Sequence, residues 1–585
     1  MLHPRALAIG LAAAAQVFPW FGAPTVCAAE PVPPSAGTVI PKLPALPAPR
    51  NANSPELRVL RPASAAGANE ATDATPIPVA RLELVGNKVF SSAGLIAASG
   101  FTPGSFTLAQ LLALAARMTD AYRQQGYFLA QVIVPAQDVD VTGVTGVTSA
   151  TGGTVTLQVL EGQYGAVTLR NSSGLHDAVV QRLLGSAVAP GQAIAAAPLE
   201  RSLLLMSDVP GVAVQSTLAP GAAVGSSDLL IDAADTRRYS GSVDMDNAGG
   251  PYTGRVRVGA TLNVNNPLGL GDLFSVRVFG ATNGLLQYGH VSYQLAAAQA
   301  QVGVGYSHMR YWLGGVYSSL SATGYGDIGS LFASYPLLRS RGANLNALLN
   351  FDAKYFSDAQ RTAGTQSAKA ARVLTATLSG DAPDRWGGSN FSDLSAVSNF
   401  AVTAVAGQLD LRGADAQAAD FSTVHTNGNY TKLVYSGSRL QRIALDKSVF
   451  VSVNGQFANK NLDVSEKMAL GGANAVRAFP DGEGYGDQGV LLKVEARWDL
   501  PRWQAVATQP QLFAFVDSGR VTLNKNNATP LPNERSLSGA GLGLNLVSDQ
   551  DVLVRLVWAH KFGSVRATSS PDAASRVWLQ LVKSL

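Results

Sequence analysis

The sequence predicts a transmembrane antiparallel β-barrel of about 16 strands, preceded by two small α/β domains. Three observations carry this prediction. Apolar and polar residues alternate with a period of two through residues 237–585. A mixed strand and helix pattern occurs twice before that region, in residues 78–161 and 162–236. Charged residues make up only 14% of the 585 residues, while glycine occurs 59 times. This composition argues against a coiled coil, a helical solenoid or an acidic disordered chain.

The first 29 residues have the features of an export signal. A weakly basic start is followed by an apolar stretch over residues 6–22, and small residues precede Glu30. Cleavage after Ala29 would remove Cys27, the single cysteine, and leave a mature chain without a disulfide. Beyond the signal, no run of about 18 apolar residues predicts a transmembrane helix.

Residues 30–77 have the composition of a linker. Prolines recur there among alanine, serine and asparagine, which favours an extended, semi-rigid backbone over a packed core. A helical pattern over residues 54–61 is too short to be trusted. We therefore expect a tether.

The two α/β domains show the same order of elements. In the first, we expect a strand over 80–90, a helix over 108–125, and strands over 128–134 and 154–160. Thr107 and Gln110 have capping-box spacing at the start of that helix. In the second, we expect strands over 165–170, 212–217 and 228–232, and helices over 175–184 and 199–206.

From residue 237 the helical period is replaced by strict alternation. One stretch shows it clearly: Leu492, Lys493, Val494, Glu495 and Ala496. An antiparallel sandwich would also alternate, but repetition along the whole region, without a helical segment to cover a core, favours a membrane barrel. Closing the sheet pairs every backbone group, as a bilayer without water requires. At about ten residues per strand and as many per connection, the region accommodates roughly sixteen strands. With the export signal, this predicts a Gram-negative outer membrane location.

The sequence shows no enzymatic site. The motifs of serine hydrolases, zinc proteases, P-loop proteins and calcium loops are absent. Beyond the signal, the histidines are scattered without ligand spacing: His176, His290, His308, His425 and His560. We expect no catalysis, no cofactor and no metal. The formal charge of +4 is small for this length, so we also expect no nucleic-acid partner.

The most unusual segment is the glycine-rich stretch 471–489, called here the long loop. By composition alone it could be a solvated extracellular loop. However, its many glycines indicate a tightly folded path, and Arg477 lies near Phe479, as in a docked tip.

The long loop resembles a signature motif of the outer-membrane transporters of two-partner secretion, which export filamentous adhesins and haemolysins. Two groups of residues match it: Val476, Arg477, Ala478 and Phe479, then Gly486, Asp487, Gln488 and Gly489. A second motif of that family, Phe-x-Asp-x-Gly on a late strand, is matched by Phe515, Asp517 and Gly519. Residues 246–272 also resemble the first barrel hairpin of these proteins.

The resemblance implies the organisation and the function of the mature chain. The α/β domains 78–161 and 162–236 would be polypeptide-transport-associated (POTRA) domains in the periplasm. They would bind an unfolded, secreted partner exoprotein, such as an adhesin or a haemolysin. The barrel, 237–585, would export this partner without nucleotide hydrolysis. Outer-membrane lipid and the barrel assembly machinery would be further partners.

Two features depart from the family pattern. The linker shows no convincing version of the helix that often plugs these barrels. The chain ends in Leu585, although such barrels commonly end in an aromatic residue, and Trp578 is the nearest one. An outer-membrane protein insertase, a passive porin and a barrel enzyme are alternatives. Insertases usually carry more periplasmic domains, porins have no reason to carry residues 79–235, and an enzyme would need a nucleophile and a base.

The strand parity around the second motif predicts a contact. Leu512, Ala514 and Val516 suit lipid, so Phe513, Phe515 and Asp517 should face the lumen. A guanidinium fits a carboxylate bidentately. We therefore expect Arg477 and Asp517 to meet inside the barrel and hold the long loop in its working position.

Overall fold

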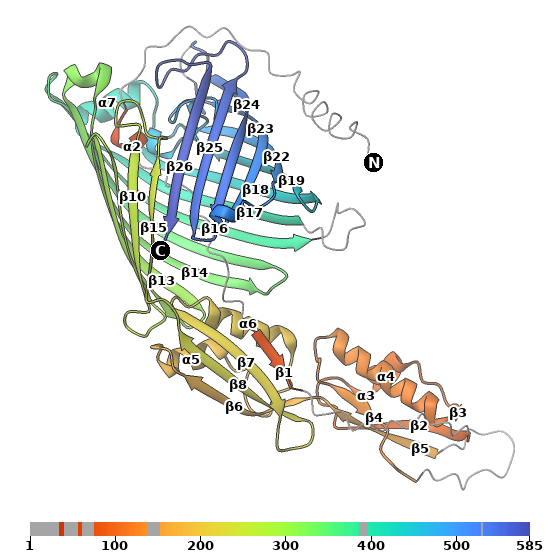
Figure 1. Ribbon diagram of the computed structural model, residues 1–585. Coiled ribbons are helices and arrows are strands. Elements are labelled where there is room, and N and C mark those ends of the chain that lie inside the picture. The colour runs from red at the N-terminus through yellow and green to blue at the C-terminus, as the bar shows by residue number, and fades with distance from the viewer. Residues whose placement is uncertain (1–33, 40–55, 61–74, 139–152, 385–395, 528–529) are drawn as a thin grey trace, which may run out of the picture. The chain divides into compact units, whose positions relative to one another are not determined.

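The computed structural model describes residues 34–39, 56–60, 75–138, 153–384, 396–527 and 530–585. They form two compact units. One unit contains the barrel together with residues 34–39, and the other contains the two α/β domains (Figure 1). The expected export signal lies outside the described residues. No helix in the described ranges is long and apolar enough to cross a membrane.

The first α/β domain packs two helices on a four-stranded sheet. Its elements are β2 (Ile77–Val85), α3 (Ser92–Ser99), β3 (Gly104–Phe106), α4 (Leu108–Gln124), β4 (Gln131–Ile133) and β5 (Gly153–Leu160), with the sheet order β3-β2-β5-β4. The predicted capping box of α4 is confirmed: Thr107 and Gln110 bond each other's backbone N–H groups. The expected strand over 128–134 is shorter, because a turn from Tyr127 to Ala130 precedes it.

A buried carboxylate fastens the helices of this domain to its sheet. Glu161 follows β5 and accepts hydrogen bonds from the backbone N–H groups of Lys88 and Val89, both at 2.7 Å. The Tyr122 hydroxyl donates to the same carboxylate at 2.8 Å. Burial, and then this hydrogen bond, raise the pKa of Tyr122, so the hydroxyl remains a donor.

The second α/β domain contains a strand from the linker. Its own elements are β6 (Gln163–Asn171), α5 (Asp177–Leu184), α6 (Ala196–Ser207), β7 (Val212–Pro220) and β8 (Ser226–Asp235). The sheet order is β1-β7-β8-β6, where β1 is Glu56–Val59. This corrects one expectation: the segment 30–77 is not only a tether, because Glu56–Val59 form a strand. The side chains of Leu57 and Val59 suit a strand. Four residues are too few for a stable isolated helix, whereas pairing with β7 gives their backbone groups hydrogen-bond partners.

The third region is a closed barrel of sixteen antiparallel strands, as expected. Neighbours in sequence pair in order, and β26 closes the barrel on β9. The strands are β9 (Tyr239–Asp246), β10 (Arg257–Asn265), β11 (Leu273–Ala281), β12 (Leu286–Ala297), β13 (Ala300–Trp312), β14 (Ala322–Arg339), β15 (Asn344–Gln360), β16 (Thr365–Asp384), β17 (Ala396–Arg412), β18 (Gly428–Ala444), β19 (Lys447–Ala458), β22 (Gln488–Asp499), β23 (Thr508–Thr522), β24 (Glu534–Ser548), β25 (Val552–Lys561) and β26 (Ser575–Ser584).

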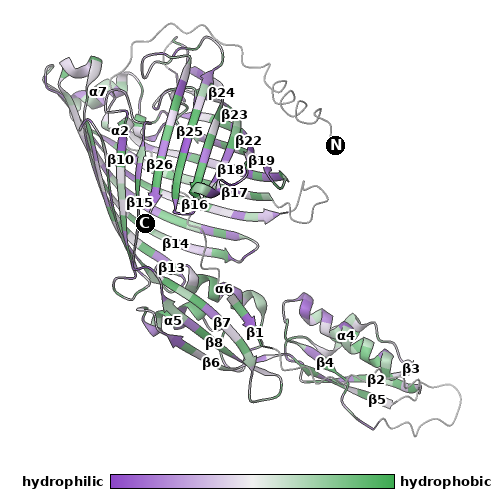
Figure 2. Ribbon diagram, viewed as in Figure 1, coloured by the Kyte–Doolittle hydropathy of each residue, from purple (hydrophilic) through white to green (hydrophobic). Residues whose placement is uncertain are grey.

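Alternation along the strands separates an outer face from a lumen. Figure 2 shows hydrophobic and hydrophilic positions alternating along the barrel strands. On β23, Leu512 is 42% exposed, whereas Phe513 and Phe515 are buried. The predicted parity is thus confirmed. An apolar outer face avoids the cost of placing polar groups against lipid.

A single helical turn, α2 (Ala36–Val39), lies against the inner wall of the barrel. The backbone N–H of Ala36 donates to Asp358 at 2.8 Å, and Tyr311 donates to the carbonyl of Pro34 at 3.4 Å. Both partners lie on the lumen parity of their strands, and Ala36 is fully buried. This is a second correction to the tether. One turn is too short for a helical period to show in the sequence, so its packing against the wall decides its conformation.

Candidate functional site

The long loop folds back into the barrel instead of extending into solvent. Its base is closed by β20 (Met468–Ala469) and β21 (Tyr485–Gly486), which pair with each other. Between them the side chains are almost fully buried: Leu470, Val476, Arg477, Ala478, Phe479 and Glu483. The expectation of a tightly folded path is confirmed.

Arg477 and Asp517 meet, as the strand parity predicted. The Nε and Nη2 atoms of Arg477 donate to the two oxygens of Asp517 at 2.7 and 2.6 Å. The backbone N–H of Arg477 also donates to Asp517, at 3.1 Å. Arg477 is 2% exposed and Asp517 is fully buried. Such a bidentate, charge-assisted pair fixes orientation as well as distance.

A second carboxylate, which the sequence analysis did not single out, completes the contact. Glu495 on β22 accepts from Nη1 of Arg477 at 2.6 Å. Arg497 donates twice to Glu495, at 2.9 and 2.7 Å, and Arg555 approaches it to 3.6 Å. Three guanidinium groups therefore surround two buried carboxylates. Glu495 alternates with apolar residues in the same register as Lys493. This pattern could have identified Glu495 as a lumen residue.

Phe515, the aromatic residue of the second motif, contacts the guanidinium of Arg477. The Cζ atom of Arg477 lies 3.5 Å from the ring centre of Phe515. Desolvated cation–π contacts of this kind contribute about 2 kcal/mol. Gly519 matters for space, because a Cβ there would lie 2.6 Å from Leu470 of the incoming loop.

The last barrel strand also contacts the loop tip. The indole N–H of Trp578 on β26 donates to the backbone carbonyl of Arg477 at 2.7 Å. Trp578 drew attention in the sequence only as the aromatic residue nearest to the C-terminus. Its role in the loop contact could not be anticipated, because a backbone acceptor leaves no sequence pattern.

The Gly-Asp-Gln-Gly segment anchors the base of the loop. Asp487, fully buried, accepts from the backbone N–H groups of Leu462 and Lys525 at 3.0 and 2.7 Å. Gln488 donates to the carbonyl of Ala458 at 2.9 Å. A Cβ at Gly486 or Gly489 would lie 2.5 Å from Val521, so both positions require glycine for close approach.

Glu483 ties the loop to the connection between β25 and β26. Its carboxylate accepts from the backbone N–H groups of Thr568 and Ser569, both at 2.8 Å, and pairs with Arg535. The sequence analysis did not single out this residue. The loop is therefore held at its base, at its tip and on its far side by separate polar contacts.

Comparisons with known proteins agree with this architecture. The family described as haemolysin secretion/activation protein ShlB/FhaC/HecB matches residues 225–546, and the ShlB-type POTRA domain matches residues 77–162. The heme/hemopexin transporter protein HuxB of Haemophilus influenzae (strain 86-028NP) is 28% identical over 442 residues, covering 75% of each chain. The outer membrane transporter CdiB of Dickeya dadantii (strain 3937) is 23% identical, covering 77% of this chain and 76% of CdiB.

Two solved structures share the fold. CdiB from Escherichia coli matches with a TM-score of 0.71 at 19% identity, covering 90% of this chain and 93% of that chain. CdiB from Acinetobacter baumannii matches with a TM-score of 0.63 at 16% identity, covering 99% and 97%. At this level of identity, both likenesses concern the fold alone.

Proposed function

The chain belongs to the haemolysin secretion/activation protein ShlB/FhaC/HecB family, and on this premise we propose how it binds the protein that it exports. As a member, it is an outer-membrane transporter that exports a secreted partner protein, with its POTRA domains in the periplasm. The proposal is that the POTRA domains bind the unfolded partner by main-chain pairing at their sheet edges. The barrel then passes the extended chain outward, without nucleotide hydrolysis.

One observation carries this proposal. The segment Glu56–Val59 comes from outside the second domain and adds to its sheet as a parallel strand beside Gln215–Leu218. The edge of β7 is therefore able to accept a strand that is not part of the domain. Such strand addition recognises an extended chain through backbone groups and tolerates many side chains. An unfolded exoprotein offers that kind of backbone.

The first domain supplies a second edge of the same kind. β4 lies at the border of its sheet and pairs with β5 on one side only, within the residues that the structure describes. It is short, so the grip there would be weak and reversible, as the transit of a long chain requires. We propose that the edge of β4 and the edge of β7, when β1 leaves it, act in sequence on the passing chain.

The long loop forms the second part of the proposal. We propose that the motif residues from Val476 to Phe479 and from Gly486 to Gly489 position the loop against Phe515, Asp517 and Gly519. The buried ion pair of Arg477 supports this, since it fixes the loop tip to the wall. Outer-membrane lipid and the barrel assembly machinery are proposed as further partners.

Deleting residues 79–161 tests the role of the first domain. The barrel should still insert, as judged by heat-modifiable mobility on gels, while secretion of the partner is lost. The matched control replaces Gln131 with alanine, which leaves the backbone edge of β4 in place and should leave secretion intact. Normal secretion by the deletion variant would refute a required role for this domain.

A further inference from the structure

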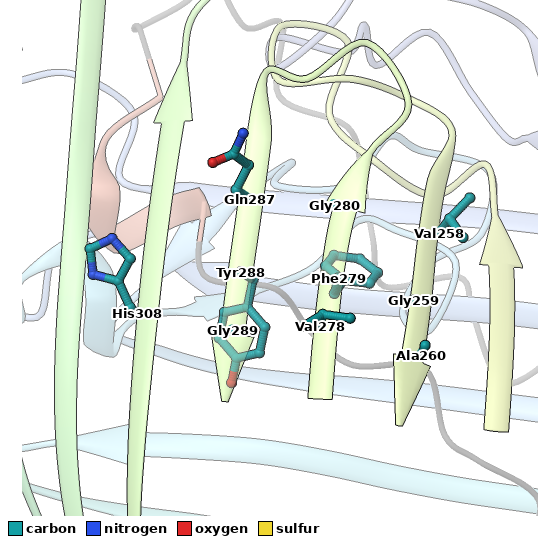
Figure 3. A pocket seen from close by; sticks show the side chains of 10 residues that line it. All are labelled: Val258, Gly259, Ala260, Val278, Phe279, Gly280, Gln287, Tyr288, Gly289 and His308. Carbon is teal, nitrogen blue, oxygen red and sulfur yellow. The ribbon is translucent and has the colours of Figure 1, made fainter. Parts of the chain in front are cut away.

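The outer face of the barrel contains a groove of about 480 Å³ across strands β10 to β13 (Figure 3). The residues that line it on the outer face include Val258, Ala260, Val278, Gly280, Gly289 and His308. Direct cross-strand partners share one face of a sheet, and these residues pair in rows across the four strands. Val258 and Val278 are 42% and 56% exposed. The groove therefore faces the membrane, and small residues at Gly280 and Gly289 make it hollow.

The groove lies close to the extracellular rim. β9 follows the periplasmic domains, so its last residue, Asp246, lies at the extracellular end of the barrel. β10 starts from that same end, at Arg257, one residue before Val258. Gly280 is the next-to-last residue of β11, which ends at Ala281. The groove thus lies at the level of the outer leaflet.

Polar side chains continue from the groove along the same rows of the outer face. Gln287 and His308 line the groove. In the row of Gln287, the next two strands carry Arg310 and Tyr325. Deeper in the membrane the outer face becomes wholly apolar, with one row reading Val304, Leu331, Phe351 and Leu374. A boundary between polar and apolar rows marks where lipid headgroups give way to acyl chains, and tyrosine is common at that level.

Arg310 on β13 and Arg372 on β16 both lie on the outer face of the barrel, in rows with Tyr325 and Tyr306. His308 pairs with Asp327 at 2.8 Å, and Arg412 pairs with Asp410 at 3.2 Å. Within the described ranges no ion pair involves Arg310 or Arg372, and both are exposed. Arg310 lies over the ring of Trp312, at 4.8 Å from its centre. A guanidinium can bind a phosphate bidentately.

We propose that this groove binds an acyl chain of a phosphate-bearing lipid of the outer leaflet, with Arg310 and Arg372 binding the headgroup phosphates. The groove volume falls in the range of about 300–1,000 Å³ found for small-ligand sites. Its apolar lining fits the chain, and the two cations fit the charge. The site is separate from the long loop and does not depend on the proposed mode of export.

Filling the groove tests the acyl-chain half of the proposal. A Cβ at Gly289 would have open space around it, so Gly289→Leu fills the groove without moving the backbone. Gly437 on β18 also has open space and serves as the matched control, Gly437→Leu. The full-length protein is purified in neutral detergent, and bound lipid is counted by native mass spectrometry. We expect Gly289→Leu to retain about tenfold less bisphosphorylated lipid A than Gly437→Leu.

Two lipid probes test the headgroup half. Arg310→Gln with Arg372→Gln should reduce retention of bisphosphorylated lipid A about tenfold, to the level of the dephosphorylated form. The matched charge control, Arg442→Gln with Lys447→Gln, should retain it. Free inorganic phosphate at millimolar concentration should not displace the lipid. Equal retention by the Gly289 and Gly437 variants, or equal loss in both charge pairs, would overturn the proposal. A wild-type protein that is dimeric and becomes monomeric on Gly289→Leu would also overturn it, because the groove would then be an interface between copies.

Discussion

Arg477 and Asp517 form a bidentate ion pair in the barrel interior, with nitrogen–oxygen distances of 2.7 and 2.6 Å. The pair joins the tip of the long loop to β23. Glu495 on β22 accepts a hydrogen bond from the third nitrogen of the same guanidinium, Nη1, at 2.6 Å. One planar group therefore connects the loop to two adjacent strands, and Trp578 connects the loop to the last strand. The contact depends on the shape of the guanidinium as well as on its charge.

Arg477→Lys separates shape from charge. A lysine keeps the positive charge but cannot bond Asp517 through two nitrogens while also reaching Glu495. We expect the variant to insert normally and to secrete nearly as little partner as Arg477→Ala. The measurement is secreted partner per folded barrel, by immunoblot. Arg520→Lys, at an exposed pair with Glu534, is the control. Wild-type secretion by Arg477→Lys would show that charge alone suffices.

Trp578→Phe removes one donor and keeps most of the ring. Losing the hydrogen bond to the Arg477 carbonyl should destabilise the docked loop by about 0.5–1.5 kcal/mol. Cleavage within residues 471–489 by an added protease should then become faster, while the barrel remains folded. Trp558→Phe is the control, because Trp558 is 46% exposed on the outer face. If both variants are cleaved at the same rate, the indole does not hold the loop.

Gly37→Leu tests whether α2 obstructs the lumen. A Cβ at Gly37 would lie 3.0 Å from the Cβ of Ser465 and 3.2 Å from Nζ of Lys369. A leucine should therefore displace α2 from the barrel wall. We expect a larger and steadier conductance in planar bilayers. Gly342→Leu, where a Cβ meets open space, should conduct like the wild type. An unchanged conductance of Gly37→Leu would mean that this segment does not limit the pore.

Deleting residues 56–60 should free the edge of β7. The backbone groups of Gln215–Leu218 would lose their partner strand, so amide hydrogen exchange in β7 should accelerate there and not in β8. An unfolded segment of the partner should then bind the variant that lacks residues 56–60 more tightly than the wild type. Weaker binding would contradict this expectation, because it would assign β1 to the binding surface itself.

The sequence predicted what depends on period and local chemistry. The barrel and its strand number follow from alternation, and the start of α4 follows from Thr107 and Gln110. The pairing of Arg477 with Asp517 was predicted from strand parity together with the family motifs. In each case a pattern in the chain reports directly on the face or the cap that a residue occupies.

What the sequence did not predict depends on contacts between distant segments. The four residues of β1 and the single turn of α2 are too short to carry a period, and each is held by a neighbour far away in sequence. Glu495 lay within a predicted strand, but its partner was hidden in a loop of undetermined path. Trp578 and Glu483 bond to backbone groups, which every residue possesses.

The central claim is that the Arg477–Asp517 contact holds the long loop in the position that export requires. A double-mutant cycle on secretion yield tests it most directly, using Arg477→Ala, Asp517→Ala and the double variant. Breaking a buried pair costs about 3–5 kcal/mol, and the barrel should tolerate this because its strand ladders are unaffected. We predict that all three variants reach the outer membrane, that each single variant impairs secretion, and that the double variant is little worse than either. Additive losses would contradict the account, because independent effects would mean that the contact is not the reason these residues matter.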